Sequence, residues 1–326
     1  MKTLRATLAL ATALTLGALA LGAPAHAAEY PDRPVRVQVG FAAGGGADIL
    51  ARWLVDRIAK ASGGAFIVEN KVGASGNLAL DAAAKARPDG LTLLIASTVT
   101  TAGNAAVFKQ MPMDVRKDIT PVAAFAETPF VIAVAPDSPI ANVAQLTDFI
   151  KSRNGKATYG SATTSSLATA ALYLKAVDAQ ATHVGYKATA NAVQDVTTKQ
   201  IDMAFADVVY AVGQAKANRI KILAIASDDR SPGLPDVPTL RETVKARTGD
   251  IVAHWGLWAT AGTPQPILDK LEQWTLEATK GEDARAFLVE QGATPKVIGS
   301  AEYKKRFETA LQAWEEAVKI AKIEPQ

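Results

Sequence analysis

The chain has 326 residues, with 35 Lys and Arg, 32 Asp and Glu and 3 His, which gives a formal net charge of +3 at pH 7. This near balance offers no basic face of the kind that nucleic acid requires, so no nucleic-acid partner is expected. The chain contains no cysteine, which excludes disulfides, thiolate chemistry and lipid attachment through an N-terminal cysteine.

Residues 1–27 have the three parts of a secretory signal peptide. "MKTLR" is positively charged, "ATLALATALTLGALALGA" is apolar, and "APAHA" places small residues at Ala25 and Ala27. A membrane anchor is the alternative, but the A-x-A pattern favours cleavage after Ala27. Without Lys2 and Arg5, 33 basic and 32 acidic residues remain. No later apolar run reaches the roughly 18 residues of a membrane span, so a soluble periplasmic protein is expected.

The first elements alternate between strand and helix. One helix carries apolar residues at 3–4 spacing, namely Ile49, Leu50, Trp53, Leu54 and Ile58. Such an alternating order predicts a parallel, doubly wound sheet. The predicted elements are a strand at 35–41, a helix at 47–60, a strand at 65–70, a helix at 77–90 and a strand at 91–97.

A second alternating set follows from residue 130. The rhythm breaks at "SPGLPDVPTL" (231–240), and amphipathic helices follow "IVAHWGLWAT" (251–260). The set contains strands near 130–139, 156–161, 181–186, 201–207 and 220–227, with helices at 142–152, 166–177, 189–199 and 210–217. The late helices are predicted at 264–281, 283–292 and 300–322.

The two sets contain a matched feature. "VQVGFAAGGGADILARWL" (37–54) and "KATYGSATTSSLATAALYL" (156–174) each read as a strand, a loop of small residues and a helix. A helix start presents unpaired N–H groups and a partial positive charge, which favour carboxylate, phosphate or polar oxygen. The pair suggests two α/β lobes with helix N-termini facing a cleft. Alternatively, Asp48 only caps its own helix and Gly44–Gly46 form only a turn.

Enzyme motifs are incomplete. A dinucleotide fingerprint needs a third glycine where Ile49 stands, and "GASGN" (73–77) is one residue short of a nucleophile elbow. His183 and His254 lie far apart, and no zinc-binding spacing exists. We therefore expect no catalysis, no cofactor and no metal.

Further polar residues are candidates for ligand contact. Ser97 and Thr98 follow a buried strand at its carboxyl end, where open α/β sheets bind ligands. Ser75 either binds ligand or caps the helix at 77. Asp207 either accepts a hydrogen bond from a ligand or caps a helix, and Tyr186 either faces the cleft or packs at a strand end.

The chain resembles a known family along residues 29–326. "YPDRPVRVQVGFAAGGGADILAR", "VENKVGASGNLALDAAAKARPDGLTLL", "KDITPVAAFAETPFVIAV", "HVGYKA", "RSPGLPDVPTL", "WGLWATAGTP" and "AWEEAVKIAKIEP" occur in the family's order. The resemblance is to the Bug family, the substrate-binding proteins of tripartite tricarboxylate transporters. It implies a type II periplasmic binding-protein fold, α/β with two doubly wound lobes and a hinged cleft, and reversible capture of a small organic solute.

The resemblance also implies which loops hold the ligand's oxygen atoms. In the first lobe these are Gly44, Gly45, Gly46 and Ala47, with Asp48 beside them, and in the second lobe they belong to Ser161–Ser166. The chain departs from the family pattern at both loops. Alanines replace the usual proline before the glycines and the usual Thr or Ser beside the aspartate. The second loop lacks the usual glycines and histidine but contains four consecutive hydroxyl residues, Thr163, Thr164, Ser165 and Ser166.

The sequence thus predicts a monomeric solute-binding protein that delivers a carboxylate-bearing molecule to membrane transporter subunits. A sensor subunit for a membrane kinase, or a hydrolase using the same cleft, are the alternatives. We expect one domain at 28–127 plus 252–326 and an inserted one at 128–251, with hinges at 124–129 and 247–253. We also expect Thr163–Ser166 to donate the decisive hydrogen bonds to the ligand, because a cap alone needs only one such residue.

Overall fold

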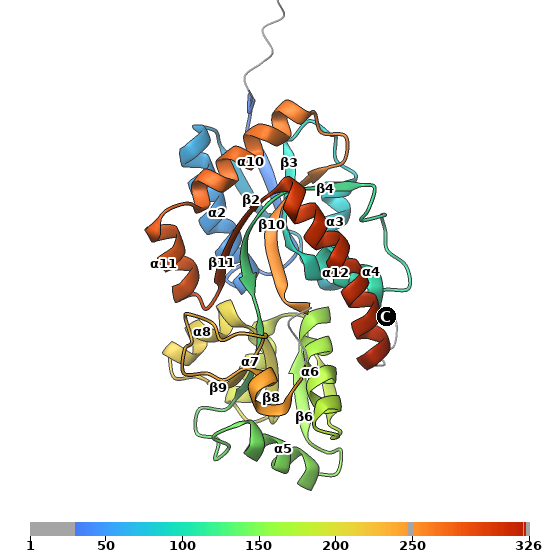
Figure 1. Cartoon of the computed structure of the whole chain (residues 1–326), viewed down its shortest axis with the longest axis vertical. Helices are drawn as coiled ribbons and strands as arrows, with labels where there is room; N and C mark the ends of the chain where they lie inside the picture. Colours follow the sequence, from blue (N-terminus) through green and yellow to red (C-terminus); the bar gives the residue numbers. More distant parts are fainter. Residues whose placement is uncertain (1–29, 247–250, 322, 324–326) are drawn as a thin grey trace, which may run out of the picture. The chain divides into compact units, whose positions relative to one another are not determined.

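The computed structural model describes residues 30–246, 251–321 and 323 (Figure 1). The predicted signal peptide, residues 1–27, lies outside the described residues. The described residues from Arg33 onward form one compact unit. Among the described residues, no helix combines the length and the apolar character that crossing a bilayer demands.

The first sheet has six strands in the order β11-β4-β10-β3-β1-β2. Strand β1 pairs in parallel with both β2 and β3, whereas β10 runs antiparallel to β3 and to β4, and β11 runs antiparallel to β4. The strands are β1 Val35–Val39, β2 Phe66–Asn70, β3 Thr92–Ser97, β4 Ile119–Thr128, β10 Ala253–Thr260 and β11 Thr294–Gly299.

The second sheet has five strands in the order β7-β6-β8-β5-β9. Strands β7, β6 and β8 are parallel, and β5 is antiparallel to both β8 and β9. Figure 1 shows the chain passing from β4 of the first sheet into β5 of the second. The strands are β5 Phe130–Val134, β6 Thr158–Ser161, β7 Thr182–Gly185, β8 Met203–Asp207 and β9 Lys221–Ala226.

The predicted α/β class is confirmed, and β1, β2 and β3 form the parallel sheet that was predicted for residues 35–97. Each sheet has a parallel set of three strands built by strand–helix–strand crossovers, and antiparallel strands complete it.

The described helices are α2 Gly46–Ser62, η2 Ala74–Gly76, α3 Asn77–Ala84, η3 Val99–Gly103, α4 Asn104–Val107, α5 Val143–Ser152, α6 Thr164–Ala176, α7 Thr189–Thr197, α8 Val208–Lys216, α9 Leu240–Val244, α10 Gln265–Thr279, α11 Glu282–Glu290 and α12 Ser300–Ala321.

Helix α2 illustrates how the predicted periodicity positions a loop. Leu50, Leu54 and Ile58 are almost completely buried, while Trp53 stacks on Phe287 with ring centroids 4.9 Å apart. Burying three such side chains stabilises the fold by several kcal/mol, on the order of 1.5–3 kcal/mol each. The helix is therefore firmly anchored, and the glycine loop at its N-terminus has a fixed position.

Candidate functional site

A cavity of about 280 Å³, which we call the smaller cavity, is lined by loops that follow strands of both sheets. The first sheet contributes the glycine loop after β1 and residues after β3. The second sheet contributes the starts of α6 and α7 and the end of β8. These are the carboxyl ends of parallel strands, which is where open α/β sheets bind ligands.

The glycine loop brings bare backbone to this cavity. Gly44 has φ +77°, a left-handed conformation that glycine adopts without strain. At Gly46 an added Cβ would overlap the Asp207 carboxylate of the second sheet. The glycines are therefore needed for two separate reasons, a turn at Gly44 and a close approach at Gly46.

Four helix N-termini meet at the smaller cavity. Helix α6 is capped by Thr163, which accepts a hydrogen bond from Ser166 N–H at 3.1 Å. Helix α8 is capped by Asp207, which accepts from Tyr210 N–H at 2.8 Å. The N-cap residues of α2 and α7 are Gly45 and Ala188, and neither provides a side-chain cap. Since all four N-cap residues line the cavity, two uncapped, partially positive helix ends face it from different sheets.

Charged side chains at the smaller cavity are few. Burial raises the pKa of Asp207, although hydrogen bonds from Tyr210 N–H and the Thr189 side chain oppose the change. Lys187 is an exposed cation on the lining. The site therefore combines one carboxyl group, held toward its neutral form, with one cation and two helix ends.

Aromatic side chains form much of the rest of the lining. Phe41, Phe130 and Trp255 come from the ends or crossings of strands. The indole N–H of Trp255 donates to Thr128 Oγ1 at 2.7 Å, and both residues are buried. This hydrogen bond fixes the ring against the cavity, so a ligand would meet a rigid apolar wall beside the polar helix ends.

The structure brings seven of the fifteen predicted site residues to the smaller cavity. They are Gly44, Gly45, Gly46, Ala47, Ser97, Thr163 and Asp207. The others lie outside its lining. They are Asp48, Ser75, Thr98, Ser161, Thr164, Ser165, Ser166 and Tyr186.

Most of these outer residues have protein partners. Ser161 Oγ lies 2.7 Å from His183 Nε2, and Tyr186 donates to Asp195 at 2.7 Å. Thr98 Oγ1 accepts from His254 N–H at 3.2 Å. These polar groups stabilise strand ends, and their hydrogen bonds are made within the protein.

Asp48 holds the glycine loop from behind. Its carboxylate accepts from Gly44 N–H at 2.9 Å, from Arg52 Nε at 2.9 Å and from Asn70 Nδ2 at 2.8 Å. Burial raises the pKa of Asp48, but these donors outweigh that effect and lower the pKa below its usual value. Asp48 therefore stabilises the loop that faces the cavity. It is not the N-cap of its helix, a position that belongs to Gly45.

The four hydroxyl residues after β6 point in different directions. Ser166 completes a capping box with Thr163, its Oγ accepting from Thr163 N–H at 2.9 Å. Thr164 donates to Asn104 at 2.8 Å. Ser165 is completely buried, and its Oγ has no hydrogen-bond partner among the described residues. Only Thr163 of the four reaches the cavity, and its hydroxyl already serves the cap.

The sequence did not reveal several lining residues. The start of α7 contributes Lys187, Ala188 and Thr189, and Tyr210 comes from α8. A signal for the start of α7 was available. "YKA" (186–188) begins at the last residue of a predicted strand, and in the first set the segment after a strand end is the glycine loop. The missing cap could have been found, because the predicted helix at 189–199 places Ala188 at the N-cap and alanine has no side-chain acceptor.

A second cavity, of about 500 Å³, lies on the other face of the strands that cross between the sheets. Thr128, Phe130, Ala253 and Trp255 line the smaller cavity, whereas Glu127, Pro129, Val252 and His254 line the larger one. Successive side chains of an extended strand point to opposite faces. The same two crossing segments therefore form a wall of both cavities.

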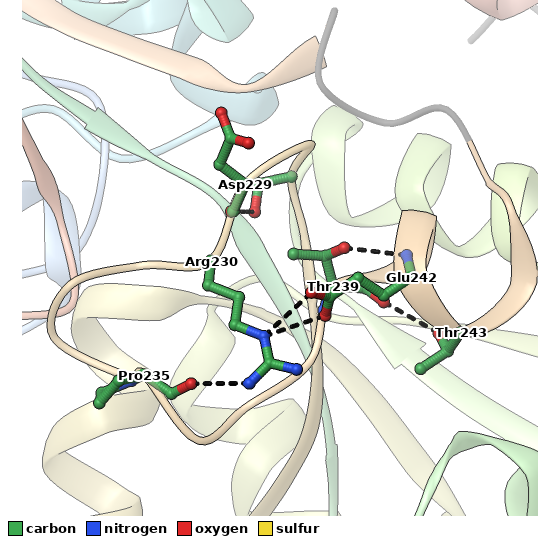
Figure 2. Close-up of polar contacts among 7 residues, drawn as sticks. Asp229, Arg230, Pro235, Thr239, Glu242 and Thr243 are labelled. Atoms are coloured by element: carbon green, nitrogen blue, oxygen red, sulfur yellow. Dashed lines mark hydrogen bonds and ion pairs between the residues drawn. The ribbon is translucent and has the colours of Figure 1, made fainter.

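Ion pairs occupy the walls of the larger cavity. Glu127 Oε1 lies 3.2 Å from His254 Nδ1, 3.8 Å from Lys296 and 3.9 Å from Arg306. Arg230 donates to both oxygens of Glu242 and to the Pro235 carbonyl, as Figure 2 shows.

The same close-up shows the Asp229 carboxylate directed away from Arg230. Thr239 and Glu242 form a capping box that holds the acceptor of Arg230 in place. Arg230 and Arg306 of the larger cavity are already paired with carboxylates, and its lining adds Asp229. The smaller cavity with its uncapped helix ends is therefore the better candidate for binding an anion. Within the described residues, no group of three or more His, Cys, Asp or Glu side chains is arranged to hold a metal ion.

Comparison with known proteins places the chain in a family. The family model described as "Tripartite tricarboxylate transporter family receptor" matches residues 50–322. A UPF0065 protein of Bordetella bronchiseptica is 32% identical over 307 residues, covering 94% of this chain and 89% of its own length.

Two solved structures are similar to this one over most of the chain. Rpa4515 of R. palustris, in a structure with adipate, has a TM-score of 0.87 at 27% identity and covers 91% of this chain and 100% of its own. MatC (Rpa3494) from Rhodopseudomonas palustris, with bound malate, has a TM-score of 0.80 at 30% identity, covering 89% and 100%. The resemblance predicted from the sequence is confirmed, and the chain belongs to the tripartite tricarboxylate transporter family of receptors.

Proposed function

We propose that this protein is a periplasmic solute-binding protein that captures a small carboxylate-bearing molecule in the smaller cavity and delivers it to a tripartite tricarboxylate-type membrane transporter. The observation that carries the proposal is the pair of uncapped helix N-termini, at Gly45 and Ala188, which face one cavity from different sheets. Each presents free N–H donors and partial positive charge to an anion.

The surroundings of these helix ends suit capture without chemistry. Phe41, Phe130 and Trp255 offer apolar contact to a carbon skeleton, while the helix ends offer donors to its oxygen atoms. Adipate and malate, the molecules found with two similar structures, are both small dicarboxylates, which fits two helix ends on opposite walls. We expect the ligand to be released chemically unchanged.

The export and domain assignments belong to the same proposal. A signal peptide at residues 1–27 would deliver the chain to the periplasm, where it would act as a monomer. Residues 28–127 plus 252–326 would form one domain and 128–251 the other. The described strands of the first sheet lie within 28–127 plus 252–326, except that β4 extends one residue further, to Thr128. The described strands of the second sheet lie within 128–251.

The first test is a ligand screen on the protein without its first 27 residues. Thermal shift and calorimetry would cover malate, adipate, citrate, aromatic carboxylates, amino acids and neutral sugars. A ligand at 100 times its dissociation constant stabilises the protein by about 2.7 kcal/mol. Binding of carboxylates with recovery of the unaltered compound supports the proposal. Binding of neutral sugars or cations alone, or conversion of the compound, contradicts it.

A sharper test gives the open helix ends an internal anion. Gly45→Asp and Ala188→Asp each place a carboxylate at an N-cap position where a ligand carboxylate would sit. Both variants should stay folded, since Asp is a favoured N-cap residue and Gly45→Asp changes stability by only a few tenths of a kcal/mol. Carboxylate binding should nevertheless fall by more than tenfold. The matched control is Asn142→Asp, which adds the same charge at the N-cap of α5, outside the smaller cavity, and should leave binding unchanged.

A further inference from the structure

Asn104 lies at a junction between the two walls of the smaller cavity. It is completely buried and begins α4, after the η3 segment that follows β3 of the first sheet. Its side-chain oxygen accepts from Thr164 Oγ1 at 2.8 Å, and Thr164 belongs to α6 of the second sheet. One amide thus connects elements of both sheets.

The other end of the same amide holds a strained turn. Asn104 Nδ2 donates to the Ser75 carbonyl at 2.9 Å and to Asn77 Oδ1 at 2.8 Å. Ala74 and Ser75 have φ angles of +47° and +52°, a conformation that non-glycine residues adopt only when their surroundings impose it. The Asn104 donor is one of the contacts that impose it.

The turn supports the cavity wall directly. Its third residue, Gly76, is so close to Phe41 and Thr100 that an added Cβ would contact both side chains. Phe41 and Thr100 line the smaller cavity. On the opposite wall, Thr164 directly follows Thr163, which lines the same cavity. The hydrogen bonds of Asn104 therefore extend to residues immediately behind both walls.

From this geometry we infer that Asn104 and Thr164 are positioning residues, which couple the 74–77 turn to the start of α6 and thereby set the separation of the two cavity walls. Neither side chain touches the ligand. A ligand that contacts both walls binds only those molecules in which the two walls are correctly spaced. If fewer molecules have this spacing, the apparent affinity for the ligand is lower. This inference rests on the proposed function where ligand affinity is measured, but not where hydrogen–deuterium exchange is measured without ligand.

The test compares Thr164→Val, which removes the hydroxyl donor, with Thr164→Ser, which keeps it. Hydrogen–deuterium exchange is measured without ligand on peptides covering 74–77 and 163–167. Thr164→Val should raise exchange in both peptides together, and Thr164→Ser should restore the wild-type rates. Faster exchange in the 163–167 peptide alone, or no restoration by serine, overturns the inference.

Affinity for malate and adipate forms the second arm. Thr164→Val leaves a buried acceptor on Asn104 without its donor and should weaken binding about tenfold, mainly through faster dissociation. The control is Thr147→Val, which removes a hydroxyl bonded to Tyr173 at 2.9 Å. Neither residue lines the smaller cavity, so this variant should leave affinity unchanged.

The two arms separate the possible failures. If the wild-type protein binds no carboxylate, the proposed function falls while the exchange experiment still decides on Asn104. If the wild-type protein binds and Thr164→Val binds as tightly, the inference falls alone.

Discussion

Replacing Asp48 by Asn should destabilise the protein by about 3 kcal/mol at pH 7. The carboxylate accepts three hydrogen bonds, from Gly44 N–H, Arg52 and Asn70, and its side chain is only 4% exposed. An amide has one oxygen, so at least one donor would face an NH₂ group. Losing one buried bond to a charged group costs about 1.5–3 kcal/mol, and the others lose their charge assistance.

The pH dependence of this loss has a fixed sign. The pKa of Asp48 is lowered in the folded protein. Its stabilisation is therefore fully present above the pKa of about 3.9 of an unfolded aspartate and is lost as the pH falls through the lower folded value. Urea unfolding at pH 7 should show the full difference between wild type and Asp48→Asn. Measured at a pH close to 3, the difference should be smaller.

A control on the same helix isolates the effect of burial. Asp56 pairs with Lys60 at 2.6 Å, but their side chains are 64% and 73% exposed, so Asp56→Asn should cost no more than about 0.5 kcal/mol. If Asp48→Asn costs less than about 1 kcal/mol at pH 7, or if its cost is independent of pH, then the three hydrogen bonds do not hold the glycine loop as described.

Two further predictions concern the crossing strands and the glycine loop. Burial raises the pKa of Glu127, but the interactions with His254 and the nearby cations lower it below its usual value. Stability should therefore decline below about pH 4–5 as Glu127 becomes protonated, and Glu127→Gln should flatten that decline in unfolding curves recorded from pH 7 to pH 3. Gly46→Ala should weaken carboxylate binding more than tenfold in calorimetry, because the new methyl group would overlap Asp207; unchanged affinity would show that the two loops separate freely. Gly44→Ala meets open space but has φ +77°, so it should lower the unfolding free energy by about 1 kcal/mol, as measured in urea.

The sequence predicted elements whose periodicity is strong and local. The strand–loop–helix unit at the glycine loop was found because Leu50, Leu54 and Ile58 mark one buried face and because consecutive glycines are costly without a role. Ser97 was found by its place after a buried strand. Two antiparallel strands, β5 and β9, were predicted, but β4 was harder to find. It contains Pro121 and several alanines and pairs irregularly with both neighbours, which obscures an alternating pattern.

The hydroxyl loop shows why side-chain direction escapes a sequence. Helix α6 begins at Thr164, two residues before the predicted start. Each residue of a helical turn rotates by about 100°, so consecutive hydroxyls face a cap, a neighbouring amide and the interior in turn. Three of the four hydroxyl groups make hydrogen bonds within the protein, whereas Ser165 Oγ has no partner among the described residues. Their partners depended on where the helix begins and on Asn104, which lies 60 positions away in the chain.

The two segments that cross between the sheets separate the smaller cavity from the larger one, and their alternate residues face opposite cavities. At 127–130 and 252–255, one set of side chains meets the smaller cavity and the interleaved set meets the larger one. Substitutions at Thr128 or Trp255 can thus reshape the smaller cavity while the neighbouring side chains of Glu127 and His254 stay in the larger one. An insertion or deletion of a single residue, in contrast, would exchange the faces and move the Glu127 carboxylate into the smaller cavity. These segments can therefore accept substitutions of single side chains, but they cannot accept a change in the number of residues.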